Sequence, residues 1–94
     1  MTDTERLQVL KKNLQVMNTT NDVLLVHLLA QSGRRLGTMG VTDDGSGEYD
    51  DLLIDFAAYL YRSRARLEAD SGMPRFLRKE LNDMKIRQRA EVES

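Results

Sequence analysis

Residues 49–67 constrain the fold of this chain more than any other segment, because as a helix they are apolar around most of their circumference. At about 100° per residue, the apolar side chains fall on two neighbouring stripes. The first contains Leu53, Phe56, Ala57, Leu60 and Leu67, and the second contains Ile54, Ala58, Tyr61 and Ala65. An ordinary surface helix needs an apolar stripe of only about 100°. We therefore expect a helix at the centre of a monomer or one whose second stripe faces a neighbouring subunit, and both can hold.

The N-terminal segment predicts a first helix. Thr2 and Glu5 have the spacing of a capping box, in which each side chain accepts a hydrogen bond from the backbone amide of the other. We expect this helix to end near Gln15. Its apolar face would carry Leu7, Leu10, Leu14 and Met17. Lys11 and Lys12 are expected to point away from that face.

A second helix is expected to begin at residue 20 or 21, with the Asp22 carboxylate at the positive end of the helix dipole. Residues 23–30 are apolar except for His27. We interpret the segment as a core helix that ends at Gly37, since glycine is the usual residue just after a helix.

The sequence predicts one long loop, over residues 37–48. These residues contain four of the six glycines and no apolar periodicity. Their acidic side chains do not follow the spacing of a calcium-binding loop, which ends in a bidentate glutamate at the twelfth position. We therefore expect no metal ion in the loop.

The C-terminal half predicts two further helices. The third is expected to run from Glu48 to Glu68, and the fourth to begin at Pro74, a residue that suits the first helical position. A narrow apolar stripe then follows at Leu77, Leu81 and Met84. The remaining residues are mostly charged and bury little surface. We predict a single helical domain over residues 1–84 and a charged C-terminal tail over residues 85–94, either frayed or docked on a partner.

The predicted fold class is all-α: a small bundle of about four helices with a glycine-rich loop between the second and third. No stretch alternates apolar and polar residues as a strand does. The 94 residues suffice for one domain, and the absence of cysteine excludes disulfides and thiolate metal sites. No apolar run approaches the roughly 20 residues of a membrane span, and the N-terminus is acidic, so we expect a soluble chain without a leader or membrane contact.

The charge differs between the two halves of the chain. Residues 1–57 contain 5 basic and 9 acidic side chains, a net charge of −4, whereas residues 58–94 contain 9 basic and 6 acidic ones, a net charge of +3. The C-terminal half is thus suited to a nucleic-acid backbone, to an acidic partner or to a head-to-tail contact between copies.

Arginine and aromatic residues alternate in part of the basic half. The basic residues are Arg62, Arg64, Arg66, Arg75, Arg78 and Lys79, and the aromatic residues among them are Tyr59, Tyr61 and Phe76. Such a surface suits nucleic acid, but arginine and tyrosine are also enriched at protein interfaces. Acidic residues interrupt the stretch, which favours a solvated face or a protein interface.

No group of residues predicts catalysis. His27 is the only histidine and has no carboxylate three or four positions away, so neither a zinc site nor a catalytic base is indicated. Ser46 and Ser63 lack the setting of an activated nucleophile, and the glycines do not form a phosphate-binding motif. We expect no catalytic, metal or cofactor site, and no enzymatic activity.

Two strings are distinctive in combination: Ala-Ala-Tyr-Leu-Tyr-Arg at residues 57–62 and Met-Pro-Arg-Phe-Leu-Arg at residues 73–78. Together with Leu-Lys-Lys-Asn-Leu-Gln-Val at residues 10–16 and the order of the elements, they make the chain resemble head-tail connector (adaptor) proteins of bacteriophages with long, non-contractile tails. The resemblance covers most of the chain but not the glycine-rich loop or the C-terminal tail.

The resemblance implies a non-enzymatic virion protein at the head-tail interface, assembled in the host cytoplasm. Such a protein docks on the portal protein after DNA packaging and forms a ring, expected to be twelvefold. The ring extends the DNA channel and presents a surface to the stopper or tail-completion protein. Double-stranded DNA passes through it without sequence-specific recognition.

The same resemblance implies which residues make these contacts. It assigns Tyr59, Tyr61, Arg62 and Arg64 to the packing of the ring, and the wide apolar arc adds Ile54 and Ala58 to that subunit interface. It assigns Met73, Pro74, Arg75, Phe76 and Arg78 to the portal-facing segment. An alternative from another class is a small phage-type nucleic-acid-binding accessory protein that uses the basic fourth helix, recognisable by salt-dependent DNA binding.

Overall fold

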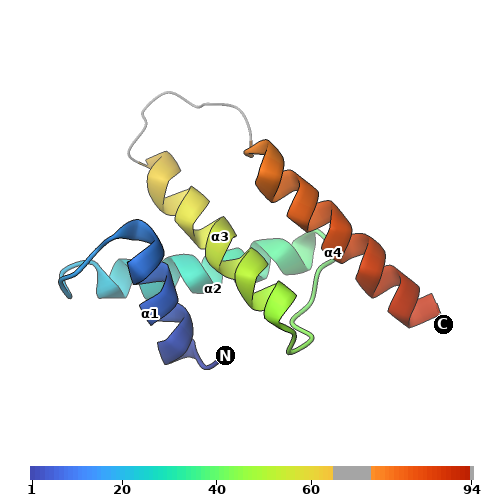
Figure 1. Ribbon diagram of the computed structural model, residues 1–94, viewed down its shortest axis with the longest axis horizontal. Helices are drawn as coiled ribbons and strands as arrows, with labels where there is room; N and C mark the ends of the chain where they lie inside the picture. Colours follow the sequence, from blue (N-terminus) through green and yellow to red (C-terminus); the bar gives the residue numbers. More distant parts are fainter. Residues whose placement is uncertain (65–72, 94) are drawn as a thin grey trace.

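The computed structural model describes residues 1–64 and 73–93, apart from the side chains of residues 64 and 91–93. Its four α-helices are α1 (Asp3–Leu14), α2 (Asp22–Thr38), α3 (Gly47–Arg64) and α4 (Arg75–Glu93). The described residues contain no strand, so the predicted all-α class is confirmed. In Figure 1, α3 crosses the middle of the molecule, with α1 on one side, α4 on the other and α2 passing behind it.

Helix α1 begins and ends as its sequence predicts. The Thr2 hydroxyl accepts a hydrogen bond from the Glu5 amide at 3.1 Å, and the Glu5 carboxylate accepts one from the Thr2 amide at 2.9 Å. Gln15 then adopts a left-handed conformation, with φ of 59°, which stops the helix. Both ends are set by local interactions, which explains why they could be predicted.

The position of Lys11 was predicted wrongly, whereas Lys12 is exposed as expected. Lys11 is only 8% exposed, and its Nζ lies 2.9 Å from Oδ1 of Asp22. The lysine stem covers apolar surface while its ammonium group reaches the start of α2. A contact between helices therefore decides where this side chain points.

Helix α2 continues through Gly37, the predicted stop, to Thr38. The Met39 amide donates to the carbonyl oxygens of Arg35 and Leu36, at 3.0 and 3.1 Å. The left-handed position falls at Gly40, with φ of 93°. A glycine can remain inside a helix at modest cost, so its presence alone did not locate the end.

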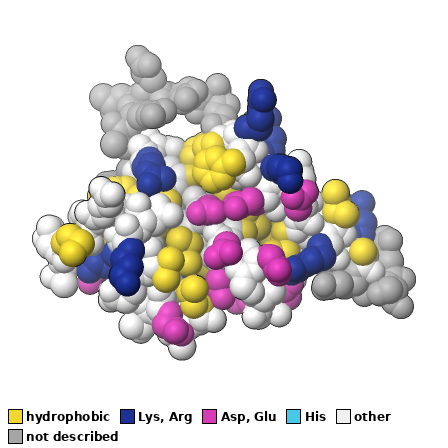
Figure 2. Space-filling model, in the orientation of Figure 1, with side chains coloured by type: hydrophobic (Ala, Val, Ile, Leu, Met, Phe, Trp, Pro, Cys, Tyr) yellow, Lys and Arg dark blue, Asp and Glu magenta, His cyan; other side chains and the backbone are white. Residues whose placement is uncertain are grey.

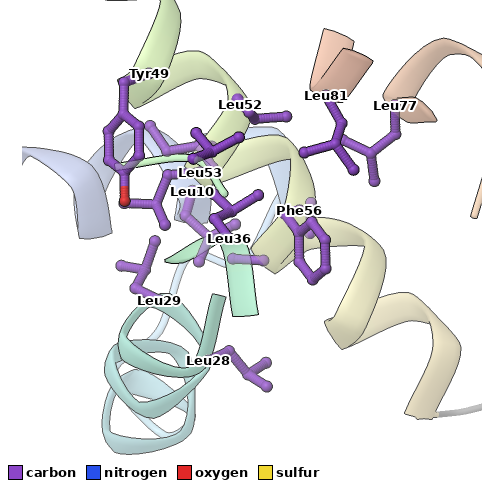
Figure 3. Close-up of a cluster of buried hydrophobic side chains, with 14 of the residues drawn as sticks. Leu10, Leu28, Leu29, Leu36, Tyr49, Leu52, Leu53, Phe56, Leu77 and Leu81 are labelled. Carbon is purple, nitrogen blue, oxygen red and sulfur yellow. The ribbon is translucent and has the colours of Figure 1, made fainter. Parts of the chain in front are cut away.

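Helix α3 is the centre of the core, because it packs against α1, α2 and α4. Its buried apolar residues occupy about two thirds of its circumference at 100° per residue: Tyr49, Leu52, Leu53, Ile54, Phe56, Ala57 and Ala58. Figure 3 shows Leu77 and Leu81 of α4 on one side of α3, and Leu10 and Leu29, from α1 and α2, on another. The predicted continuation of α3 to Glu68 lies outside the described residues.

Helix α4 rests on α3 through the predicted stripe, since Leu77, Leu81 and Met84 are buried. It begins directly after Pro74 and continues without a break through Glu93, so the boundary proposed after residue 84 does not interrupt the helix. Gln88 is also buried and fastens the loop before α3: its Nε2 donates to the Thr42 carbonyl at 2.7 Å. In the same pair, the Thr42 amide donates to Gln88 Oε1 at 3.0 Å.

Candidate functional site

Two of the predicted subunit-interface residues are not at the surface. Ile54 and Ala58 are only 3% and 1% exposed in the folded chain. The expectation that they face a neighbouring subunit is therefore wrong, because helices of the same chain cover these two residues of the second stripe. The side chain of Arg64, a third residue of that interface, lies outside the described part of the structure.

The other predicted interface residues lie near the C-terminal end of α3. Tyr59 and Tyr61 are half-buried, and the Tyr61 hydroxyl accepts a hydrogen bond from Asn21 Nδ2 at 3.4 Å. Arg62 is exposed, and its Nη2 donates to Asn13 Oδ1 at 3.1 Å. These side chains thus tie the end of α3 to α1 and to the start of α2.

The predicted portal-facing residues lie at the start of α4. Met73 and Pro74 are half-buried, whereas Arg75, Phe76 and Arg78 are exposed. The Phe76 ring is 58% exposed, an unusual position for a large aromatic side chain. This segment therefore has an aromatic residue and two cations available to a partner.

An apolar surface that the sequence did not predict lies on the outward side of α2. We call it the α2 outer face, and it consists of Val23, Val26, Ala30 and Gly37. Val23 and Val26 are 85% and 52% exposed, and a Cβ atom added to Gly37 would meet no other atom within 4 Å. At helical spacing these residues share an arc of about 60° that carries no charge. The apolar run over residues 23–30 predicted a core helix. Such a run does not reveal which side of the helix is covered.

A cleft of about 230 Å³ borders the α2 outer face. Val26 and Ala30 line it together with side chains of α1 and α3. Arg6 forms its polar edge, with Nη2 at 2.7 Å from Asp50 Oδ1 and 3.2 Å from Asp43 Oδ2. The guanidinium group thus binds the start of α3 and the loop before it, and the cleft next to the α2 outer face remains largely apolar.

A second cleft, of about 220 Å³, lies between α3 and α4 and is lined by several carboxylates: Glu48, Asp51, Glu80 and Asp83. Figure 2 shows acidic side chains gathered over the space between these helices. Burial, and then the Asp55 carboxyl group that hydrogen-bonds to it, raise the pKa of Glu80 to about 7. Among the described residues, no group of three or more His, Cys, Asp or Glu is placed to hold a metal ion. The close approach of α3 and α4 at this cleft therefore favours the protonated form of one carboxyl group.

Polar contacts fasten the C-terminal part of α4 to the loop before α3. Arg87 Nη2 lies 2.7 Å from Asp44 Oδ2, and Arg87 also pairs with Glu48. Hydrogen bonds from the hydroxyl group and the amide of Ser46 hold the pKa of Asp44 below its ordinary value. Sequence analysis did not single out Arg87, because its partners lie about 40 positions away along the chain.

Two of the residues weighed for catalysis, His27 and Ser46, have ordinary surroundings. His27 is exposed on α2. The Ser46 hydroxyl donates to Asp44 Oδ1 at 2.5 Å and accepts from the Tyr49 amide at 3.1 Å, the pattern of a helix N-cap. The contacts of Ser46 therefore stabilise the N-terminus of α3.

Comparison with protein-family models, curated proteins and solved structures found no match. In the described part of the chain, no helix is long and apolar enough to cross a membrane. The proposed function is therefore based on the surfaces of the described residues.

Proposed function

We propose that this chain is a virion structural protein, the head-tail connector (adaptor) of a bacteriophage with a long, non-contractile tail. In this role it docks on the portal protein as a ring, extends the DNA channel and links the head to the stopper or tail-completion protein. The observation that carries the proposal is the α2 outer face, an uncharged and exposed side of a helix in a small protein.

An exposed apolar face of this kind indicates assembly. Contiguous apolar patches on a soluble protein often mark the place where another protein binds. The α2 outer face combines two exposed valines with Ala30 and Gly37, whose small side chains let a second helix approach closely. Packing distances between helices depend on the side chains at the contact, and small residues shorten them.

The occupant we propose for the α2 outer face is a second copy of the chain. The predicted portal-facing segment lies on α4, which packs against α3 and, among the described helices, against neither α1 nor α2. A copy bound at α2 and a portal bound at the start of α4 therefore occupy different parts of the surface. Repeated head-to-tail contacts of one kind close into a ring when the rotation between copies permits it.

The test places a charge on the α2 outer face. Val26→Asp should leave the helix content unchanged, because Val26 is half exposed, and should prevent the protein from forming a layer on portal rings. Val23→Asp is a second variant that the fold accepts easily, since a carboxylate is favourable in the first turn of a helix. The readout is electron microscopy of each protein mixed with portal rings of the same phage, after circular dichroism has shown that it is folded.

Met17→Asp is the matched control, because Met17 is 91% exposed but lies in the turn between α1 and α2. It should form the layer normally. Normal incorporation of both valine variants would refute the interface, and a wild-type protein that never binds the portal would refute the connector role. Ala58→Asp would not test the interface, because Ala58 is buried.

The nucleic-acid-binding accessory protein is retained as the second candidate, since the basic residues of α4 favour it. If that candidate is right, the α2 variants should bind nucleic acid as tightly as the wild type, because only α4 would contact the nucleic acid. Loss of assembly in Val26→Asp therefore supports the connector over the accessory protein.

A further inference from the structure

The basic residues of α4 are not scattered around the helix. Four of them share one flank, which we call the α4 basic stripe: Arg75, Arg78, Lys85 and Arg89, all exposed. Their spacings of three, seven and four residues place them within an arc of about 80° at 100° per residue. The only other residue of that arc between Arg75 and Arg89 is Asn82, which is also exposed and uncharged.

The opposite flank of α4 has a different character. It carries Glu80 and Asp83, which line the acidic cleft, together with Arg87, which pairs with Asp44 and Glu48. The remaining cations of α4 thus have acidic partners, and Lys79 pairs with Asp83 at 3.1 Å.

The stripe is different, because no described acidic residue forms an ion pair with any of its four cations. The single hydrogen bond found for them joins Arg78 Nη2 to the Met73 carbonyl oxygen at 3.5 Å. Their charge is therefore available to an anion from outside.

The dimensions of the stripe suit a phosphate backbone. From Arg75 to Arg89 the helix rises about 21 Å at 1.5 Å per residue, roughly the length of six base pairs at 3.4 Å each. Arginine presents a planar fork of donors that matches phosphate oxygens, and asparagine also donates to them.

An acidic protein fits the stripe less well. Protein interfaces have an apolar or aromatic centre that supplies most of the binding energy. The exposed apolar residues of α4, Phe76 and Ile86, lie outside the arc of the stripe, which contains only cations and an amide. The stripe therefore has the composition of a nucleic-acid backbone contact.

We infer that the α4 basic stripe binds the phosphate backbone of double-stranded DNA without reading its sequence. The inference rests on the proposed connector role for the identity of the duplex, which is the DNA inside the channel. The binding itself belongs to the isolated chain and can be measured with any duplex. The stripe and the α2 outer face lie on different helices, so DNA binding and the contact between copies can be lost independently. Arg75 and Arg78 also belong to the proposed portal-facing segment, so DNA binding is measured on the isolated chain, without the portal.

The test compares two triple variants that change the net charge equally. The stripe variant is Arg75→Gln, Lys85→Gln and Arg89→Gln, three residues for which no described hydrogen bond or ion pair is lost. The matched control is Lys12→Gln, Arg34→Gln and Arg35→Gln, three exposed cations on α1 and α2. Fluorescence anisotropy with two 30-base-pair duplexes of unrelated sequence, from about 25 to 200 mM salt, gives affinity and salt dependence.

The wild-type protein should bind both duplexes equally, and its affinity should fall with salt at a log-log slope of about −3 to −4, close to −0.9 for each neutralised phosphate. The stripe variant should lose at least about tenfold in affinity at the lowest salt and retain a slope near −1, since one of four contacts remains. The control should retain the wild-type slope.

Three results would overturn the inference: no wild-type binding at the lowest salt, an equal loss in both triple variants, or equally tight binding of a poly-glutamate peptide. A strong preference for one duplex would contradict readout of the backbone alone. None of these results depends on the portal assay. Conversely, a Val26→Asp protein that binds DNA normally but forms no layer would separate the two proposals.

Discussion

Helices α3 and α4 are similar in length but differ in how they are covered. Helix α3 is enclosed by the other three helices, whereas α4 rests on α3 along one stripe and presents the rest of its surface to solvent. The apolar arc of each helix matches this difference, since α3 has two stripes and α4 has one. The comparison shows that the width of an apolar arc reports how many neighbours cover a helix, but not whether they belong to the same chain.

The two helices also divide their tasks. Helix α3 supplies the core, and its polar residues near the C-terminal end bind other parts of the same chain. Helix α4 has a buried stripe, an acidic flank at the cleft with α3 and a basic flank whose cations form no ion pair with a described acidic residue. A helix covered on one side has the remaining sides available for other molecules, which is why the DNA proposal involves α4.

The largest effect expected from this difference comes from placing the same charge on each helix. Ala58→Asp in α3 should lower the free energy of unfolding by more than about 3 kcal/mol, because it buries a carboxylate without a partner. Ala90→Asp in α4 should lower it by less than about 1 kcal/mol, since Ala90 is exposed. Urea unfolding followed by circular dichroism measures both, and equal losses in the two variants would contradict the division between a covered and an open helix.

The sequence predicted those parts of the fold that depend on local interactions. The capping box of Thr2 and Glu5, the end of α1 and the stripe of α4 all follow from neighbours in the sequence, and all were confirmed. The position of Lys11 depends on a contact between two helices, and it was predicted wrongly. Long-range packing cannot be read from the spacing of residues within one segment.

The candidate surfaces were predictable to a smaller extent. The assignment of the start of α4 to the portal stays a prediction, whereas the burial of Ile54 and Ala58 and the exposure of the α2 outer face were missed. Both errors have one physical origin: this small chain covers the buried apolar side chains of α3, and α2 is then left with one uncovered side. The competition between α2 and α3 for partners is a property of the whole chain.

A smaller effect, on pH dependence, tests the cleft where α3 and α4 meet. The pKa of Glu80 is raised from 4.5 to about 7, so the folded chain binds a proton more tightly than the unfolded chain does. The stability due to this group is present in full below about pH 4.5 and is lost as pH rises through about 7. Because the cleft is open to solvent, we expect the loss to be about 1 kcal/mol.

Glu80→Gln isolates this contribution. The amide cannot ionise, so the difference in unfolding free energy between variant and wild type should shift in favour of the variant between pH 5 and 8. The carboxylates with lowered pKa values, such as Asp44 and Glu48, act below about pH 4.5 and leave this window clear. Parallel curves of unfolding free energy against pH for wild type and Glu80→Gln from pH 5 to 8 would contradict this prediction. They would show that protonation of Glu80 does not stabilise the packing of α4 on α3.

The smallest effect is expected for an exposed ion pair within α4, between Lys79 and Asp83 one helical turn away. Both side chains are mostly exposed, so a double-mutant cycle of Lys79→Ala and Asp83→Ala should give a coupling energy of only about 0.3–0.5 kcal/mol, reduced further by salt. The same cycle on Lys11 and Asp22, a partly buried pair between α1 and α2, should give a larger value that responds less to salt. If the two cycles gave equal energies with equal salt dependence, the exposed ion pair of α4 would be held as firmly as the contact between α1 and α2, which would contradict the division between a covered and an open helix.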